Sequence, residues 1–479
     1  MTKRGLASSA ALVVLLLARA VAAQSQNTVA QGTTPEWLKD RRYTEGIGIR
    51  TGDFELHPGI AGEVGYDSNV FLRSTQSGVD NGPPDAPVVQ SAVVRITPSL
   101  YLSTLGAQRR EGDATPPVVA FRAGINATYR ALFGLGSNAS QASNDPSQED
   151  TVSGAADARL DILPGRSAGM ALFAAFTRTI LPNTANADPD VSFTQDAVRV
   201  GGELVTQPSG GTLDWRLGYE FDDTLFESTA GVPYDTYLQT VYTRGRWRFR
   251  PRTSLIYDGS IAFNSYVNFQ EAFNDAGLVD STPVRARIGL NGLVTDRFSI
   301  LLMAGWGASF INTGPLPHQQ QYDSIIGQAE LKWYLTANPA ASNPNNVSLA
   351  LSSIAIGYTR DFQTSYLGNY YGIDRGYLKF DYFFAGAAYL SLSGGVGAIE
   401  YPNIWSPDGM TERAAAFTDT RVDGTLLGEY RFSNTFALNA TLRYTQNFSN
   451  EILPEIGTTG FYGMAWQHYE AYLGVRWFM

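Results

Sequence analysis

The sequence contains no cysteine at all. A chain without thiols cannot form a disulfide scaffold, cannot bind a metal through thiolates and cannot carry a lipid on an N-terminal cysteine. The folded form must therefore depend on hydrogen bonds and packing.

Long apolar runs are also missing, apart from one short run near the start. Lys3 and Arg4 precede the apolar run 10–18, and small residues follow it over 20–23. This order predicts a secretory signal peptide over residues 1–23, with the mature chain beginning near Ala23 or Gln24. The alternative, a short membrane anchor, is disfavoured because the run falls well below the ~20 residues that a spanning helix needs.

Basic residues are outnumbered by acidic ones. When the three basic residues of the predicted signal peptide are removed from the total of 35, 32 remain against 45 acidic residues. An acidic exported chain is a poor partner for nucleic acid, so we expect no nucleic-acid binding.

Histidines are scarce, and motifs for catalysis are absent. The three histidines are His57, His318 and His468, and the chain has no HExxH, GxSxG or GxxxxGK[ST] pattern. We therefore predict that the protein is not an enzyme and expect no catalytic residues, no metal site and no cofactor. Acidic clusters are better explained as solvated loop surface than as calcium loops, because their spacing is irregular: 145–150, 188–190 and 222–227.

What the sequence does contain is alternation of apolar and polar residues with a period of two. Residues i, i+2 and i+4 of a strand share one face, so this pattern predicts half-apolar β-strands. It is clearest over 119–133, 213–222 and 468–479. Eighteen such segments can be counted: 54–66, 91–104, 118–134, 151–163, 168–181, 196–207, 212–223, 235–249, 253–266, 284–294, 298–310, 323–335, 347–360, 375–384, 387–399, 417–432, 435–447 and 467–479.

Length and spacing separate a membrane barrel from a soluble sandwich, which would alternate as well. Most segments exceed the ~9 to 11 residues that a tilted strand needs to cross a bilayer. Tight turns such as 164–167, 208–211, 295–297 and 433–434 follow even-numbered strands, and polar stretches such as 134–150, 182–195 and 268–283 follow odd-numbered ones. Short periplasmic turns and long external loops are typical of outer-membrane barrels.

We therefore predict an all-β fold, a single closed antiparallel transmembrane β-barrel of about 18 strands (16–20), located in the outer membrane. The predicted organisation is a signal peptide over 1–23, a periplasmic N-terminal lead-in over 24–52, and the barrel over 53–479. Within the lead-in, Trp37-Leu38 is a candidate for docking inside the barrel mouth. Pro58 and Pro98, and a slip of the apolar phase between Leu351 and Ile354, predict local bulges.

Two further features resemble known barrels. The last strand ends on Trp477-Phe478 before Met479, which resembles the signal read by the machinery that inserts outer-membrane barrels. The segment 46–73, with Tyr66-Asp67-Ser68-Asn69-Val70-Phe71 as its most specific element, and a second piece at 357–362, followed by Ser365 and Tyr370-Tyr371, resemble a β-barrel porin family. That family includes barrels associated with exopolysaccharide and capsule export, so the resemblance implies a porin-like barrel and, weakly, polysaccharide export. The alternative is that these residues are purely structural.

Arginines recur on the polar face of the predicted strands, most densely where Arg244, Arg246, Arg248 and Arg250 alternate. Lipid does not accept such a ladder, so we expect it to line the lumen. It forms either a path for anionic or sugar-rich solutes or a set of internal ion pairs that stiffens the wall. The lumen-lining candidates are Arg122, Arg130, Arg216, Arg244, Arg246, Arg248, Arg285, Arg287, Arg421 and Arg443.

These observations give a leading hypothesis and three alternatives. The leading hypothesis is a hydrated conduit for polysaccharide export; the alternatives are a general diffusion or solute-uptake porin, a plugged structural or adhesin barrel, and, least favoured, an outer-membrane hydrolase. Expected partners are outer-membrane lipid and lipopolysaccharide, the insertion machinery and, for export, polysaccharide and periplasmic export components.

Overall fold

The structure is a computed structural model that describes Trp37 and residues 46–74, 87–104, 117–140, 145–149, 151–179, 194–227, 234–270, 272, 277–311, 321–335, 352–384, 387–406, 411–454 and 461–479. The predicted signal peptide and most of the predicted lead-in lie outside the described residues.

Almost all of the described chain is β-structure. The strands are β1 (Ile49–Thr51), β2 (Phe54–Asp67), β3 (Gln90–Thr104), β4 (Val119–Leu135), β5 (Thr151–Ile162), β6 (Ala168–Thr179), β7 (Gln195–Thr206), β8 (Leu213–Phe226), β9 (Thr236–Arg250), β10 (Thr253–Tyr266), β11 (Ser281–Leu293), β12 (Phe298–Ile311), β13 (Tyr322–Tyr334), β14 (Ser353–Ser365), β15 (Asn369–Phe384), β16 (Ala388–Tyr401), β17 (Ile404–Trp405), β18 (Glu412–Ala414), β19 (Phe417–Arg431), β20 (Phe436–Phe448), β21 (Ile452–Pro454), β22 (Phe461–Gly463) and β23 (Trp466–Phe478). The described helical turns are η3 (Ser137–Ser140), η5 (Pro146–Glu149) and α2 (Pro208–Gly211). No helix in this part of the chain is long and apolar enough to cross a membrane.

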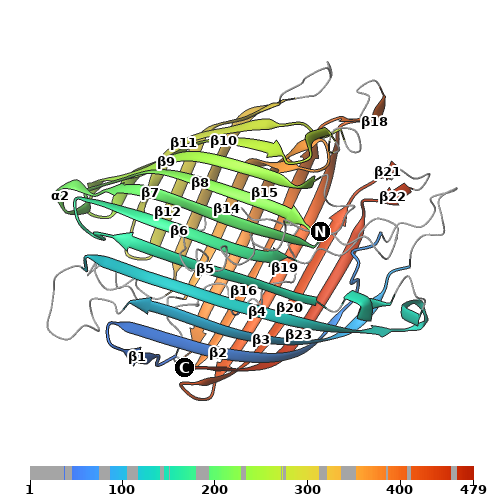
Figure 1. The fold of residues 1–479 in the computed structure, drawn as a ribbon, viewed down its shortest axis with the longest axis horizontal. Coiled ribbons are helices and arrows are strands. Elements are labelled where there is room, and N and C mark those ends of the chain that lie inside the picture. Colours follow the sequence, from blue (N-terminus) through green and yellow to red (C-terminus); the bar gives the residue numbers. More distant parts are fainter. Residues whose placement is uncertain are drawn as a thin grey trace, which may run out of the picture.

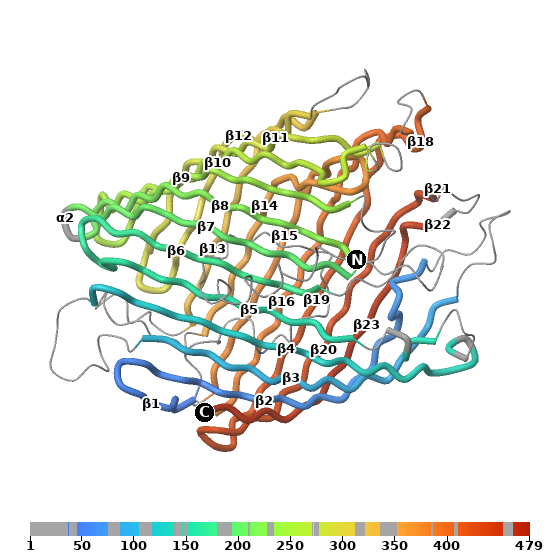
Figure 2. Tube along the Cα trace, viewed as in Figure 1, coloured from blue at the N-terminus to red at the C-terminus, as the bar shows by residue number. Residues whose placement is uncertain are grey.

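Eighteen of the described strands form a closed ring. Each long strand pairs antiparallel with the next from β2 to β16, then through β19 and β20 to β23, and β23 pairs back with β2 from Gly59↔Phe478 to Asp67↔Glu470. The first and last strands of the ring run side by side (Figure 1, Figure 2). The predicted all-β, closed antiparallel barrel of 18 strands is therefore confirmed.

The ends of the barrel differ. The short turns, α2 and the C-terminus lie at one end, here called the turn end, and the small hairpins β17–β18 and β21–β22 extend the opposite, loop end (Figure 1). The predicted alternation of connections holds for most of the ring. It is wrong at three places: at the turn end, β3 and β4 are joined by the long segment 105–118 and β13 and β14 by the long segment 335–352, and at the loop end β14 and β15 are joined by only 366–368.

The prolines do not produce the predicted bulges. Pro58 pairs with Leu100, Pro98 pairs with Ile60, and the register between β2 and β3 is continuous. The Met479 amide donates to the Pro58 carbonyl, so this part of β2 still contributes an acceptor. The phase slip predicted between Leu351 and Ile354 is not tested, because Leu351 lies outside the described residues and β14 begins at Ser353.

β1 extends the sheet beyond the predicted start of the barrel. Ile49–Thr51, which the sequence placed in the lead-in, pair antiparallel with residues 54–56 of β2. Gly46, Gly48 and Gly52 all have a positive φ, which glycine adopts without strain. These turns return the chain onto the edge of β2.

The outer surface of the barrel is apolar. Its centre carries exposed aliphatic side chains such as Val64, Ile125 and Leu473. Exposed aromatic side chains form two girdles, one near the turn end (Trp247, Phe249, Phe298, Trp333, Phe384, Phe432, Phe436) and one near the loop end (Tyr129, Phe133, Phe263, Trp306, Phe310, Phe448, Tyr469). An apolar band between two aromatic girdles on a closed barrel is the surface that outer-membrane proteins present to lipid. The chain is therefore an outer-membrane β-barrel.

Candidate channel lumen

The face opposite the lipid carries the charges. Strand register places Arg216 of β8 opposite Arg244 of β9, Arg244 opposite Asp258 of β10, and Asp258 opposite Arg287 of β11. Residues directly opposite each other in a sheet share a face, so these side chains form one continuous charged surface on the inner wall.

Glu203 of β7 is paired with three arginines from three other strands. Its buried carboxylate lies 2.6 Å from Arg159 Nη2, 3.0 Å from Arg216 Nη1 and 2.7 Å from Arg244 Nη2. The Tyr242 hydroxyl donates a further hydrogen bond at 3.2 Å. Two of the predicted lumen arginines therefore share one buried anion.

The arginine ladder of β9 changes character along its length. Arg244 pairs with Glu203, and Arg246 lies 3.5 Å from the Asp214 carboxylate, which also accepts from Arg216. The exposed Arg248 side chain has no ion-pair or hydrogen-bond partner among the described residues. The ladder is therefore neutralised at Arg244 and Arg246, toward the middle of the barrel. Arg248, near the turn end, is a cation without a counter-charge among the described residues.

The remaining predicted lumen arginines vary in the same way. Arg443 of β20 donates to the buried Glu470 at 2.6 Å, and Arg130 of β4 lies near the same carboxylate. Arg421 of β19 donates to Asn447 and lies over the Trp466 ring, with no carboxylate partner among the described residues. Arg122 of β4 lies opposite Arg159 in the register.

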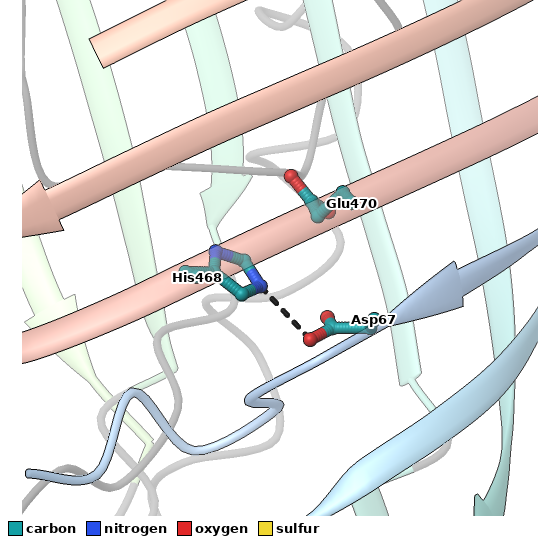
Figure 3. Close-up of side chains that lie close together, drawn as sticks. All are labelled: Asp67, His468 and Glu470. Atoms are coloured by element: carbon teal, nitrogen blue, oxygen red, sulfur yellow. Dashed lines mark hydrogen bonds and ion pairs between the residues drawn. The ribbon is translucent and has the colours of Figure 1, made fainter. Parts of the chain in front are cut away.

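Among the described residues, one group of side chains that could hold a metal ion lies where the barrel closes. Asp67 at the end of β2 meets His468 and Glu470 of β23, and their ligand atoms lie within 4.8 Å of one another (Figure 3). Each is already engaged: His468 Nε2 lies 2.8 Å from Asp67 Oδ1, and Glu470 accepts from Arg443 and from the Tyr472 hydroxyl. A cation here would have to compete with a guanidinium, so the arrangement fits an ion-pair network that fastens the closing strands.

The element Tyr66–Phe71 has a structural role beside this network. Asn69 donates to the carbonyls of Arg73 and Gln467 and accepts from the Arg73 amide, which fixes the turn after β2. Val70 and Phe71 pack into a buried cluster with Val89, Val93, Leu132, Ala139 and Tyr472. Burial lowers the pKa of the Arg73 guanidinium in this turn.

The hairpin formed by β14 and β15 leaves the wall at the loop end. β14 pairs with β13 only as far as Arg360↔Gly327, whereas its pairing with β15 continues to Ser365↔Asn369. Residues 361–371 are here called the inner hairpin. Because its β14 side has lost the neighbouring strand, this segment can turn toward the inside of the barrel.

Apolar packing holds the inner hairpin over β11 to β13. Phe362 is buried and stacks on Tyr322 with ring centroids 4.4 Å apart. Its cluster also contains Val279, Ile311, Ile326 and Tyr370. A Cβ on Gly307 of β12 would lie 2.8 Å from the Phe362 ring, so the glycine makes room for it.

The tip of the inner hairpin reaches distant loops. Asn369 accepts from the Val279 amide at 2.9 Å, and Tyr366 packs edge-on against Phe226 and Tyr234. Phe226 ends β8 and Tyr234 lies just before β9, so the hairpin spans the loop end from β15 to β8. It therefore narrows the mouth of the barrel on that side.

Asp361, at the root of the inner hairpin, joins the hairpin to the wall through ion pairs with two arginines of β11. Asp361 Oδ1 accepts from Arg285 Nε at 3.0 Å, and Asp361 Oδ2 lies 3.5 Å from Arg287 Nη1. Arg287 also donates to Asp258 of β10 at 3.0 Å. The alternation of β11 predicted both arginines on the inner face, but nothing in the sequence pattern marked Asp361 as their partner.

Trp37 docks at the turn end, as the sequence suggested. Its buried side chain packs with Ala61, Tyr101 and Leu427, and Arg476 lies over its ring. These contacts come from β2, β3, β19 and β23, around the closing strands. Leu38 lies outside the described residues.

Comparison with known proteins adds little beyond the architecture. No family model and no curated protein matches the chain, so the resemblance to exopolysaccharide-associated barrels finds no support. Similar solved structures include OccK7 (OpdD) of Pseudomonas aeruginosa (13% identity, TM-score 0.43, 90% of this chain and 99% of that chain), OccAB4 of Acinetobacter baumannii (11%, 0.39, 88% and 98%) and the siderophore receptor PirA of Pseudomonas aeruginosa (8%, 0.39, 88% and 80%). These similarities are too distant to carry a conclusion about function.

Proposed function

We propose that this protein is a diffusion channel that admits small hydrophilic solutes, with a preference for anions, across the outer membrane. The observation that supports this most is the inner wall of an 18-strand ring that is lined with charged side chains rather than packed with apolar ones. Barrels of 16 to 18 strands are wide enough to leave an aqueous channel.

The preference for anions rests on the arginines that lack a carboxylate partner. Arg248 lies toward the turn end, and Arg421 lies toward the loop end, beside Trp466. Among the described residues neither has a carboxylate partner. A guanidinium without a counter-charge attracts an anion and binds a carboxylate through two hydrogen bonds.

Polysaccharide export is the less favoured proposal. The segments that resemble exopolysaccharide-associated barrels have structural roles here, at the barrel closure and at the root of the inner hairpin. The inner hairpin also occupies part of the loop end, through which an exported polymer chain would have to leave the barrel. Small solutes are the better match to a narrowed mouth.

Liposome swelling with uncharged sugars of increasing size tests the proposal. We expect rapid swelling with monosaccharides, slow swelling with trisaccharides and none with dextran, because the inner hairpin restricts the mouth. Equal permeation of all three classes would favour a polymer conduit. A correctly folded barrel that produces no swelling, in both the unmodified form and an Asp361→Asn variant that frees the inner hairpin, would contradict the channel.

A further inference from the structure

We propose that Arg285 and Arg287 form a binding site for the carboxylate of a permeating solute, and that Asp361 of the inner hairpin occupies this site when no solute is bound. The inference rests on the proposed function as a channel and names the chemical class of its solute. It also assigns the inner hairpin a role as a gate that the solute opens.

The geometry of the arginine pair is that of a carboxylate site. Arg285 and Arg287 alternate on β11, so their side chains share the inner face. Both contact one carboxylate, that of Asp361, through Arg285 Nε and Arg287 Nη1. The bound group is therefore already a carboxylate held by two guanidinium groups.

Solvent reaches all three side chains. Relative exposure is 24% for Arg285, 21% for Arg287 and 35% for Asp361. An ion pair that is partly exposed to solvent adds little stability. A dissolved carboxylate can therefore reach the arginine pair from solvent, whereas release of the hairpin also has to open the buried packing of Phe362.

Release of the hairpin would leave Arg285 with several unmet contacts. Its Nε bonds to Asp361, its Nη2 bonds to the Phe362 carbonyl, and its guanidinium lies 4.1 Å from the centroid of the Phe362 ring. All three contacts come from the inner hairpin, whereas Arg287 keeps Asp258 on the wall. An open hairpin thus exposes a cation that an incoming anion can satisfy.

The arginine pair is occupied by Asp361 when the hairpin is docked and is free when the hairpin is released. This difference allows a solute to shift the hairpin toward the released state. A ligand shifts an equilibrium only if it binds one state more tightly than the other. A carboxylate solute binds Arg285 and Arg287 only where Asp361 has left, so it favours the open hairpin. A neutral solute of the same size has no such preference.

Asp361→Asn and Asp258→Asn form a matched pair of variants. The first removes the carboxylate of the moving hairpin, and the second removes a carboxylate of the fixed wall that contacts the same Arg287. We expect Asp361→Asn to raise the open fraction of the channel severalfold in the absence of solute. Asp258→Asn should leave the response to solute in place.

The experiment records open fraction in planar bilayers containing the full-length protein, with succinate as the probe and erythritol as its neutral counterpart. Succinate is expected to raise the open fraction severalfold, erythritol to have no effect, and the double variant Arg285→Gln/Arg287→Gln to conduct without responding to succinate. A conducting channel in which Asp361→Asn behaves as the unmodified protein would overturn the gate but leave the channel intact.

A second measurement follows the hairpin without any current. The chain has no native cysteine, and Ser365 at the end of β14 is only 9% exposed, so Ser365→Cys reports on hairpin release through its alkylation rate. We expect succinate to accelerate alkylation, and Asp361→Asn to give the fast rate without succinate. A rate that is unchanged by both would contradict the proposal, even in a protein that does not conduct.

Discussion

His468 Nε2 lies 2.8 Å from Asp67 Oδ1, and this contact joins the last strand of the barrel to the first across 401 residues of sequence. Beside it, Arg95 of β3 pairs with Glu63 of β2 at 2.9 Å, and Asn439 of β20 donates to the same carboxylate at 2.8 Å. Four strands around the point of closure are thus linked by buried polar contacts.

Loss of the His468 contact should weaken the closure. His468→Ala leaves the buried Asp67 carboxylate without its imidazole partner, which we expect to cost about 1 to 3 kcal/mol. The temperature at which the folded band disappears in heat-modifiability gels should fall. Glu412→Gln, an exposed change at β18, is the control and should leave that temperature unchanged.

Loss of Glu203 should have a larger effect on stability. Glu203→Gln removes the anion shared by Arg159, Arg216 and Arg244, and breaking a buried ion-pair network typically costs about 3 to 5 kcal/mol. Asp296→Asn, which breaks the exposed pair with Arg252, should cost at most about 1 kcal/mol. Equal midpoints of urea unfolding for the two variants would show that Glu203 is not the centre of the network.

Charge reversal at two positions of the arginine ladder should have different effects, because Arg244 is paired with a carboxylate and Arg248 is not. Arg248→Glu reverses a charge without a partner, so we expect the reversal potential in a salt gradient to shift toward cation selectivity with little change in stability. Arg244→Glu places a carboxylate beside Glu203 and should mainly lower stability. If Arg244→Glu shifts selectivity while Arg248→Glu does not, the assignment of compensated and free cations is wrong.

The two ends of the barrel can be assigned by labelling. In Ser147→Cys, at the loop end, the new thiol should react with a membrane-impermeant reagent on intact cells. In Ser167→Cys or Ser433→Cys, in short turns, the thiol should react only after the cells are lysed. Both kinds of site are exposed in the structure. Labelling of the turn sites from outside would invert the topology.

The wall of the barrel could be predicted from sequence because contact with lipid requires a regular alternation of apolar residues along each strand. Every second residue of a spanning strand must be apolar, and this alternation predicted the strand 253–266 to the residue and most others within two or three. β14 and β15 deviate most, since their observed bounds are 353–365 and 369–384. Here the tight turn at 366–368 and the inner hairpin replace the long external loop that is usual at this end.

The position of Phe362 could not be predicted from the alternation of apolar residues. The predicted strand ended at residue 360, so alternation assigned Phe362 to neither face, and the structure buries it because β14 leaves β13 after Arg360. The ion-pair partners of the lumen arginines could not be predicted either. Alternation assigns a side chain to one face of the sheet, but it does not determine which carboxylate on another strand that side chain contacts. Glu203 acquires its role through the register of the closed sheet, and Asp361 acquires its role because the inner hairpin leaves the wall.

The most direct test of the proposed channel is the current through a planar lipid bilayer that contains the purified protein. An anion-preferring channel should give stepwise increases of conductance, each from one barrel, with a reversal potential that favours anions. A protein that inserts with full heat-modifiable β-structure but leaves the bilayer without steps, in both the unmodified and the Asp361→Asn forms, would contradict it.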